Sequence, residues 1–162
     1  MDVRVEKRDQ VTIVGLEIKT YGIMKKSEPN SIPGLWEEFS EVEDQIPNLA
    51  NNHEKYGLIE FPKDWQLGNR FLYTAGIAVT NTDDIPEGMV VKEIPEQEYA
   101  IVRYQGMTNE IGKGFNYFYN EWLPQSDYQK SGAFEIEFYG EDFKGDDPES
   151  VLEVHFPVTK KG

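Results

Sequence analysis

The chain has 162 residues, a length typical of one domain, and 38% of them are hydrophobic, which is enough for a core. Its 30 acidic and 16 basic residues give a formal charge of −14, which argues against a nucleic acid or an anionic membrane surface as the main partner. Cysteine is absent, so disulfides, thiol nucleophiles and thiolate metal sites are excluded.

The first half of the chain predicts a strand, a helix and two further strands. A β-branched, roughly alternating run at residues 11–20 indicates the first strand. A helix is expected at residues 34–46, with Ser31 as its cap and Pro33 in its first turn. Its apolar residues recur at i, i+4, i+7 and i+11 on one face: Leu35, Phe39, Val42 and Ile46. The two strands follow at residues 56–61 and 71–80.

The second half repeats this order after a polar connector at residues 81–89. It predicts a strand at 98–106, a helix at 108–123, and strands at 132–140 and 150–159. The apolar face of this helix has the same spacing as the first helix, at a constant shift of 76 residues: Ile111, Phe115, Phe118 and Trp122. The triplet Ile-Glu-Phe occurs at 59–61 and again at 136–138, a shift of 77.

We interpret these matches as a duplicated strand–helix–strand–strand module. The chain would be a single α+β domain, residues 1–162, with modules at about residues 1–82 and 88–162. In such a module the helix covers one face of the sheet, and the other face needs solvent, a cover or a ligand. Two modules side by side would form a groove between them, which is a natural ligand site.

Three segments carry a resemblance to a known family: YAIVRYQG at 99–106, NEWLPQSDY at 120–128 and IEFYGEDF at 136–143. Together with FLYTAGIAV at 71–79 they closely resemble the GyrI-like small-molecule-binding domain, the effector-binding domain of AraC-type and MerR-type multidrug regulators. The resemblance implies an antiparallel α+β fold of two modules with pseudo-twofold symmetry, and a groove for lipophilic cations. Asp127 departs from the family, which usually has glycine there. With no DNA-binding helix-turn-helix before the domain, we expect a stand-alone protein rather than a transcription factor.

The resemblance also implies that Glu137, followed by Tyr139, matches the buried, ligand-pairing glutamate of the family. Strand alternation places Glu135, Glu137 and Tyr139 on one face. We expect the other set, Phe134, Ile136 and Phe138, to form the core beneath the helix. A buried carboxylate would pair with a cationic ligand, and nearby aromatic rings would add about 0.5–2 kcal/mol per cation–π contact. The alternative is that both glutamates are solvated, and for Glu135 this is the favoured interpretation.

Five further residues are candidates for the groove: Glu60, Trp36, Trp65, Tyr73 and Tyr104. Glu60 is the counterpart of Glu137 in the repeat, although a solvated position at the sheet edge is the favoured interpretation. Trp36, Trp65 and Tyr73 are candidate walls, with packing in the core or on the surface as the alternative. Tyr104 stands near a strand end, where its hydroxyl could reach the mouth of the groove.

The leading prediction is a small-molecule-binding protein that senses or sequesters lipophilic cations, as a monomer or weak dimer. No metal or cofactor is expected, because the two histidines, His53 and His155, lack ligand-like spacing. One alternative is a hydrolase of reactive cyclopropane-type toxins, with Glu137 as its acid or base. Another is a protein-interaction module such as a gyrase inhibitor, because 17 acidic and 7 basic residues lie from Thr82 onward.

The termini and the hydropathy favour a cytoplasmic protein. No apolar run approaches the roughly 20 residues that a membrane-spanning helix needs. The first ten residues lack the apolar region of a signal peptide. We therefore expect no membrane contact and no direct binding to nucleic acid.

Overall fold

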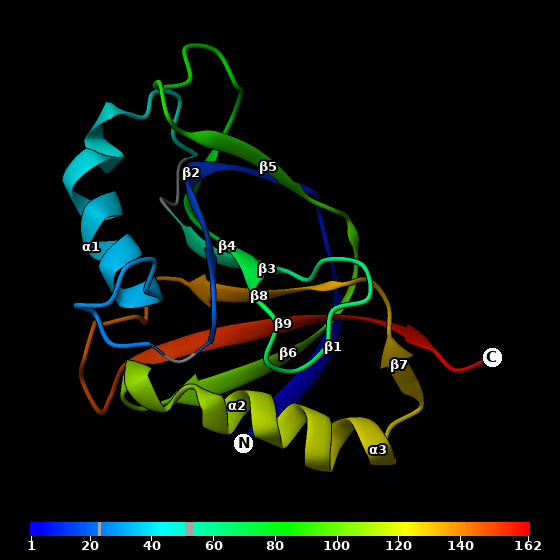
Figure 1. The fold of residues 1–162 in the computed structure, drawn as a ribbon. Coiled ribbons are helices and arrows are strands. Elements are labelled where there is room, and N and C mark those ends of the chain that lie inside the picture. The colour runs from blue at the N-terminus through cyan, green and yellow to red at the C-terminus, as the bar shows by residue number, and fades with distance from the viewer. Residues whose placement is uncertain (23, 51–53) are drawn as a thin grey trace. The chain divides into compact units, whose positions relative to one another are not determined.

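The computed structural model describes residues 1–22, 24–50 and 54–162, and His53 lies outside them. The chain forms two compact units. The first unit is Gln10–Pro95, and the second unit combines Met1–Asp9 with Glu96–Gly162. Each unit pairs an antiparallel sheet with helical segments (Figure 1), so the predicted α+β class is confirmed. No helix among the described residues is long and apolar enough to cross a membrane.

In the part of the chain that the structure describes, the first unit has four strands and one α-helix. Its strands are β2 (Val11–Thr20), β3 (Lys55–Glu60), β4 (Phe71–Val79) and β5 (Val90–Ile94), in the order β3-β4-β2-β5. The helix α1 (Ile32–Val42) continues into a 3₁₀ turn, η1 (Glu43–Gln45), and contacts β2 and β4. The predicted cap is confirmed, because the Ser31 hydroxyl accepts a hydrogen bond from the Gly34 amide at 3.1 Å.

The second unit has the sheet order β1-β6-β9-β8. These strands are β1 (Asp2–Arg8), β6 (Gln97–Gln105), β9 (Val151–Lys160) and β8 (Phe134–Tyr139), while the short β7 (Tyr128–Lys130) pairs with the end of β9. The predicted helix at 108–123 forms as a 3₁₀ turn, an α-helix, a π-helix and a last α-helical turn: η2 (Thr108–Glu110), α2 (Gly112–Tyr117), η3 (Phe118–Trp122) and α3 (Leu123–Gln125). This helical segment runs along the sheet of its unit in Figure 1.

Aromatic stacking joins the helical segment to the sheet of the second unit. Phe118 is fully buried, and its ring stacks on Phe156 of β9 with centroids 3.8 Å apart. Trp122 stacks on the other side of Phe118 at 5.7 Å. The predicted core role of this helix face is confirmed, because both side chains pack in one cluster with Val102 and Val154.

The two units do not coincide with the two halves of the sequence, because each half contributes one edge strand to the sheet of the other unit. The strand β1 precedes β2 in the chain but pairs with β6 of the second unit, and β5 precedes β6 but pairs with β2 of the first unit. Neither β1 nor β5 was expected from the sequence. Their alternation is interrupted by charged residues, and short edge strands with charges are a common way to limit unwanted pairing.

A glycine pair brings β2 and β4 unusually close together, and this generates a test. Gly15 lies opposite Gly76, and a Cβ added at Gly15 would stand 1.8 Å from the Ala75 carbonyl oxygen. Gly15→Ala should therefore lower the free energy of unfolding by about 2 kcal/mol or more, measured by chemical denaturation. Gly112→Ala is the control, because nothing lies within 4 Å of its added Cβ. Equal stabilities of the two variants would contradict the close approach.

Candidate functional site

The face of β8 that carries the glutamates is the face covered by the helical segment. Glu137 pairs with Val154 of β9, which belongs to the core around Phe118. Ile136 and Phe138 pair with His155 and Glu153 and lie on the opposite face. The prediction that Phe134, Ile136 and Phe138 form the core beneath the helix was therefore wrong. The expectation that Glu137 faces a groove on the side away from the helix was wrong for the same reason. Alternation along a strand defines which residues share a face, but it does not define which face meets a helix.

Glu135 is buried in a cluster with a tyrosine and a lysine. It is 3% exposed, the Tyr119 hydroxyl donates a hydrogen bond to its Oε2, and Lys130 Nζ lies 3.6 Å from the same oxygen. The expectation of a solvated Glu135 was wrong. Burial raises the pKa of Glu135, and Lys130 and Tyr119 partly offset this. Burial lowers the pKa of Lys130, against the attraction of Glu135.

Glu137 lies two residues further along the same face of β8. It is 7% exposed, and the Tyr139 hydroxyl donates a hydrogen bond to its Oε1 at 3.0 Å. The structure thus brings together Glu137 and Tyr139, which the sequence placed in one site. It adds Glu135, Lys130 and Tyr119 to the same side of the sheet.

A π-helix presents Tyr119 to Glu135. Tyr119 belongs to η3, and π-helical turns inside helices are frequent at functional sites. Its ring packs edge-on against Phe118 at 5.0 Å and Phe156 at 5.6 Å. Tyr119 is nevertheless 40% exposed, so the same residue contacts solvent and a buried carboxylate. Sequence reasoning missed Tyr119, since a regular helical period does not show where a π-turn occurs.

The other predicted aromatic residues have separate contacts. In the first unit, the Trp36 indole donates a hydrogen bond to the Tyr73 hydroxyl at 2.9 Å, and Tyr73 is fully buried. Trp65 instead packs on Phe61, with ring centroids 4.7 Å apart. In the second unit, Tyr104 donates to the backbone carbonyl of Met107 at 2.8 Å. Trp36 and Tyr73 therefore form one pair, and Trp65 and Tyr104 have partners of their own.

Glu60 is not the structural counterpart of Glu137. Its Oε1 lies 2.9 Å from Lys92 Nζ, and Glu17 shares that lysine at 2.6 Å. The adjacent Ile59 pairs with Tyr73, whose hydroxyl bonds to α1, so Glu60 lies on the face opposite α1. Glu137 lies on the helix-covered face of its own sheet. The two Ile-Glu-Phe triplets thus differ by one step of the strand register, which reverses the face of every side chain.

A separate charge network occupies the opposite face of β9. Glu153 accepts from the Arg4 guanidinium at 3.0 Å through Oε2, and its Oε1 lies 3.0 Å from His155 Nε2. Burial alone would raise the pKa of Glu153, but His155 and Arg4 lower it to about 2. Burial lowers the pKa of His155, which is 1% exposed, so its neutral ring donates to the carboxylate at pH 7.

Comparison with known proteins identifies the family. The model of the GyrI-like small molecule binding domain matches residues 1–159. The chain belongs to the GyrI-like small-molecule-binding domain family. Its family resemblance, first based on a few strand and helix segments, is thus confirmed over nearly the whole chain.

This GyrI-like chain is similar in sequence to a transcriptional regulator and similar in fold to several solved structures. The transcriptional regulator BrlR from Pseudomonas aeruginosa is 28% identical over 159 residues, which are 98% of this chain and 56% of BrlR. The chain therefore spans just over half the length of that relative. The structure of SAV2435 bound to tetraphenylphosphonium has a TM-score of 0.74 at 17% identity, covering 98% and 94% of the two chains. The C-terminal domain of EcmrR has a TM-score of 0.70 at 13% identity, covering 99% and 98%.

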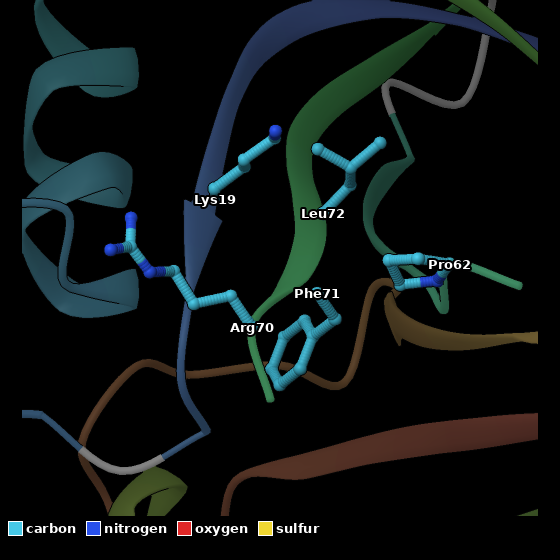
Figure 2. Close-up of a pocket in the computed structure, with 5 residues that line it drawn as sticks. All are labelled: Lys19, Pro62, Arg70, Phe71 and Leu72. Atoms are coloured by element: carbon cyan, nitrogen blue, oxygen red, sulfur yellow. The ribbon is translucent and has the colours of Figure 1, made fainter. Parts of the chain in front are cut away.

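Both units of this GyrI-like chain also have a surface pocket. Figure 2 shows the pocket of the first unit, about 270 Å³, where Lys19 and Leu72 come from the neighbouring strands β2 and β4. It is also lined by Pro62, Arg70 and Phe71. The pocket of the second unit, about 250 Å³, lies along η3 and α3, with Glu121 and Trp122 in its lining. None of the residues predicted for the groove lines either pocket.

The Glu153 network predicts a pH dependence of stability. Its folded pKa of about 2 lies below the ordinary value of 4.5, so its stabilisation is present above pH 4.5 and is lost as the pH falls toward 2. Glu153→Gln should lower the free energy of unfolding at pH 7 by about 2 kcal/mol, less than full linkage because Arg4 is half-exposed. The free energy of unfolding of this variant, measured by urea denaturation, should also fall less steeply than that of wild type between pH 4.5 and pH 2.

The control for this test is Glu121→Gln on the exposed side of η3. That variant should follow the wild-type stability curve at every pH. A Glu153→Gln curve parallel to wild type would show that the network contributes nothing to acid sensitivity.

Proposed function

We propose that this chain binds lipophilic organic cations, with the buried glutamates of β8 as counter-charge, and thereby senses or sequesters them. The observation that carries the proposal is the pair of buried carboxylates, Glu135 and Glu137, on one helix-covered face. Each accepts a hydrogen bond from a tyrosine hydroxyl. The negative charge of a buried carboxylate attracts a cation strongly, because little water lies nearby to screen it.

The surroundings of the two carboxylates support an aromatic ligand. Tyr119, Phe118 and Phe156 form an aromatic group beside Glu135, with ring centroids 3.8–5.6 Å apart. Tyr139 packs against Phe143 at 4.8 Å beside Glu137. Aromatic faces attract organic cations by about 0.5–2 kcal/mol per contact. The tetraphenylphosphonium in the SAV2435 structure is a cation of this chemical type.

The duplicated module supports the proposal at the level of the fold. In each unit the chain contributes a strand, a helical segment and two strands in the same order, and the sheet orders β3-β4-β2-β5 and β8-β9-β6-β1 correspond. We propose that the two modules arose by duplication and are related by a pseudo-twofold axis. The groove between them stays a prediction from the sequence.

Cation binding can be tested directly with tetraphenylphosphonium. Isothermal titration should give saturable binding by the wild type, and Glu137→Gln should weaken it at least tenfold, because truncating one member of a buried charge pair costs about 2 kcal/mol or more. Glu153→Gln is the matched control, a buried glutamate on the opposite face of the neighbouring strand. It should leave the affinity unchanged.

Two results would count against this proposal. One is the absence of wild-type binding at millimolar tetraphenylphosphonium. The other is equal affinity in Glu137→Gln and wild type, which would remove Glu137 from the counter-charge role.

A further inference from the structure

Glu135 is buried, whereas the two side chains that contact its carboxylate are partly exposed to solvent. The Glu135 side chain is 4% exposed, whereas that of its ion-pair partner Lys130 is 21% exposed. Tyr119, which donates a hydrogen bond to the same carboxylate, is 40% exposed. Both partners of the buried carboxylate thus extend from it to the protein surface.

The contact between Lys130 and Glu135 is loose for a buried ion pair. Their N···O distance is 3.6 Å, whereas charge-assisted hydrogen bonds measure about 2.7–2.9 Å. The Lys130 ammonium donates instead to the backbone carbonyls of Phe134 at 3.1 Å and Gly132 at 3.4 Å. Lys130 thus neutralises Glu135 while it donates hydrogen bonds to one backbone carbonyl before β8 and one at the start of β8. A cation with better access to the carboxylate can replace it.

We propose that Glu135 is itself a cation-binding carboxylate, which the free protein keeps occupied with its own Lys130. A bulky aromatic cation would displace the lysine ammonium and the Tyr119 hydroxyl together. The ligand's rings would then pack where the Tyr119 ring now lies, at the edge of the stacked Phe118 and Phe156 rings. This inference rests on the proposed function. It adds that Lys130 competes with the ligand for Glu135, which lowers the affinity for the ligand and favours cationic over uncharged ligands.

The charge balance explains the selection. In the free protein, Lys130 and Glu135 together are neutral, so an uncharged ligand of the same shape gains nothing from displacing the lysine. A cation restores the neutral pair with its own charge, and the freed lysine returns to water, where ammonium groups are well hydrated. Removal of Lys130 leaves the carboxylate without a positive partner. The affinity for cations should therefore rise, and the affinity for uncharged ligands should not.

The test compares Lys130→Met with wild type, using tetraphenylphosphonium and the uncharged triphenylphosphine oxide as probes. At pH 8.5, chosen because alkaline pH favours the carboxylate form, Lys130→Met should bind the cation about tenfold more tightly, the order expected for one charge-assisted hydrogen bond. Affinity for the uncharged probe should not change. The gain should vanish in the double variant Lys130→Met/Glu135→Gln, which isolates the coupling of the two residues. Lys113→Met, an exposed lysine on α2, is the control.

A second measurement uses the wild type and does not depend on the folding of the variant. Saturating tetraphenylphosphonium should raise the rate of reductive methylation of Lys130 several-fold, read by mass spectrometry, and leave that of Lys113 unchanged. An equal rate of Lys130 methylation with and without tetraphenylphosphonium would overturn the inference. So would a folded Lys130→Met variant that binds the cation no more tightly than wild type. Either of these two outcomes rejects only the role of Lys130 as internal competitor, provided that the wild type binds the cation and Glu137→Gln weakens binding. Absence of cation binding in every variant rejects the proposed function as well.

Discussion

The compensation of two buried carboxylates is the constraint on which the second unit depends. Glu135 and Glu137 are placed on the helix-covered face by the pleat of β8, and each would be costly there alone. Tyr139 reaches Glu137 from the same strand, two residues on. Glu135 needs partners from other elements, namely Tyr119 of η3 and Lys130 of β7. The π-helical turn and the short strand β7 thus each supply one side chain that contacts the Glu135 carboxylate.

The two faces of this sheet carry different electrostatics. The helix-covered face combines carboxylates with tyrosine hydroxyls and a loosely held lysine, and its aromatic neighbours can accept an organic cation. On the opposite face, Glu153 is held between Arg4 and His155 at 3.0 Å each. The Arg4 contact joins Glu153 to β1, whereas Glu135 and Glu137 lie beside aromatic rings that suit an organic cation. Glu135 and Glu137 are therefore the candidates for ligand binding.

The sequence predicted most of the helices and strands, and the errors have identifiable causes. Periodicity gave both helices and the strands β2, β3, β4, β6, β8 and β9 to within about two residues. The edge strands β1 and β5 were missed because charged residues interrupt their alternation. The Ile-Glu-Phe repeat was misleading, since a shift of 77 residues does not preserve the face of the strand. Glu60 and Glu137 share a local sequence but lie on different sides relative to their helices.

The sequence by itself determined the family, the α+β class and the presence of paired carboxylates on one face of a strand, because local periodicity and short motifs express these features. Only the tertiary structure decided which face the helix covers, and therefore that Glu135 is buried rather than solvated. It also supplied Tyr119 and Lys130 as partners, which stand 16 and 5 residues from Glu135 in the chain. Such pairs form when separate elements pack together. Their distances and burial are set by that packing, and no pattern within a single strand or helix encodes them.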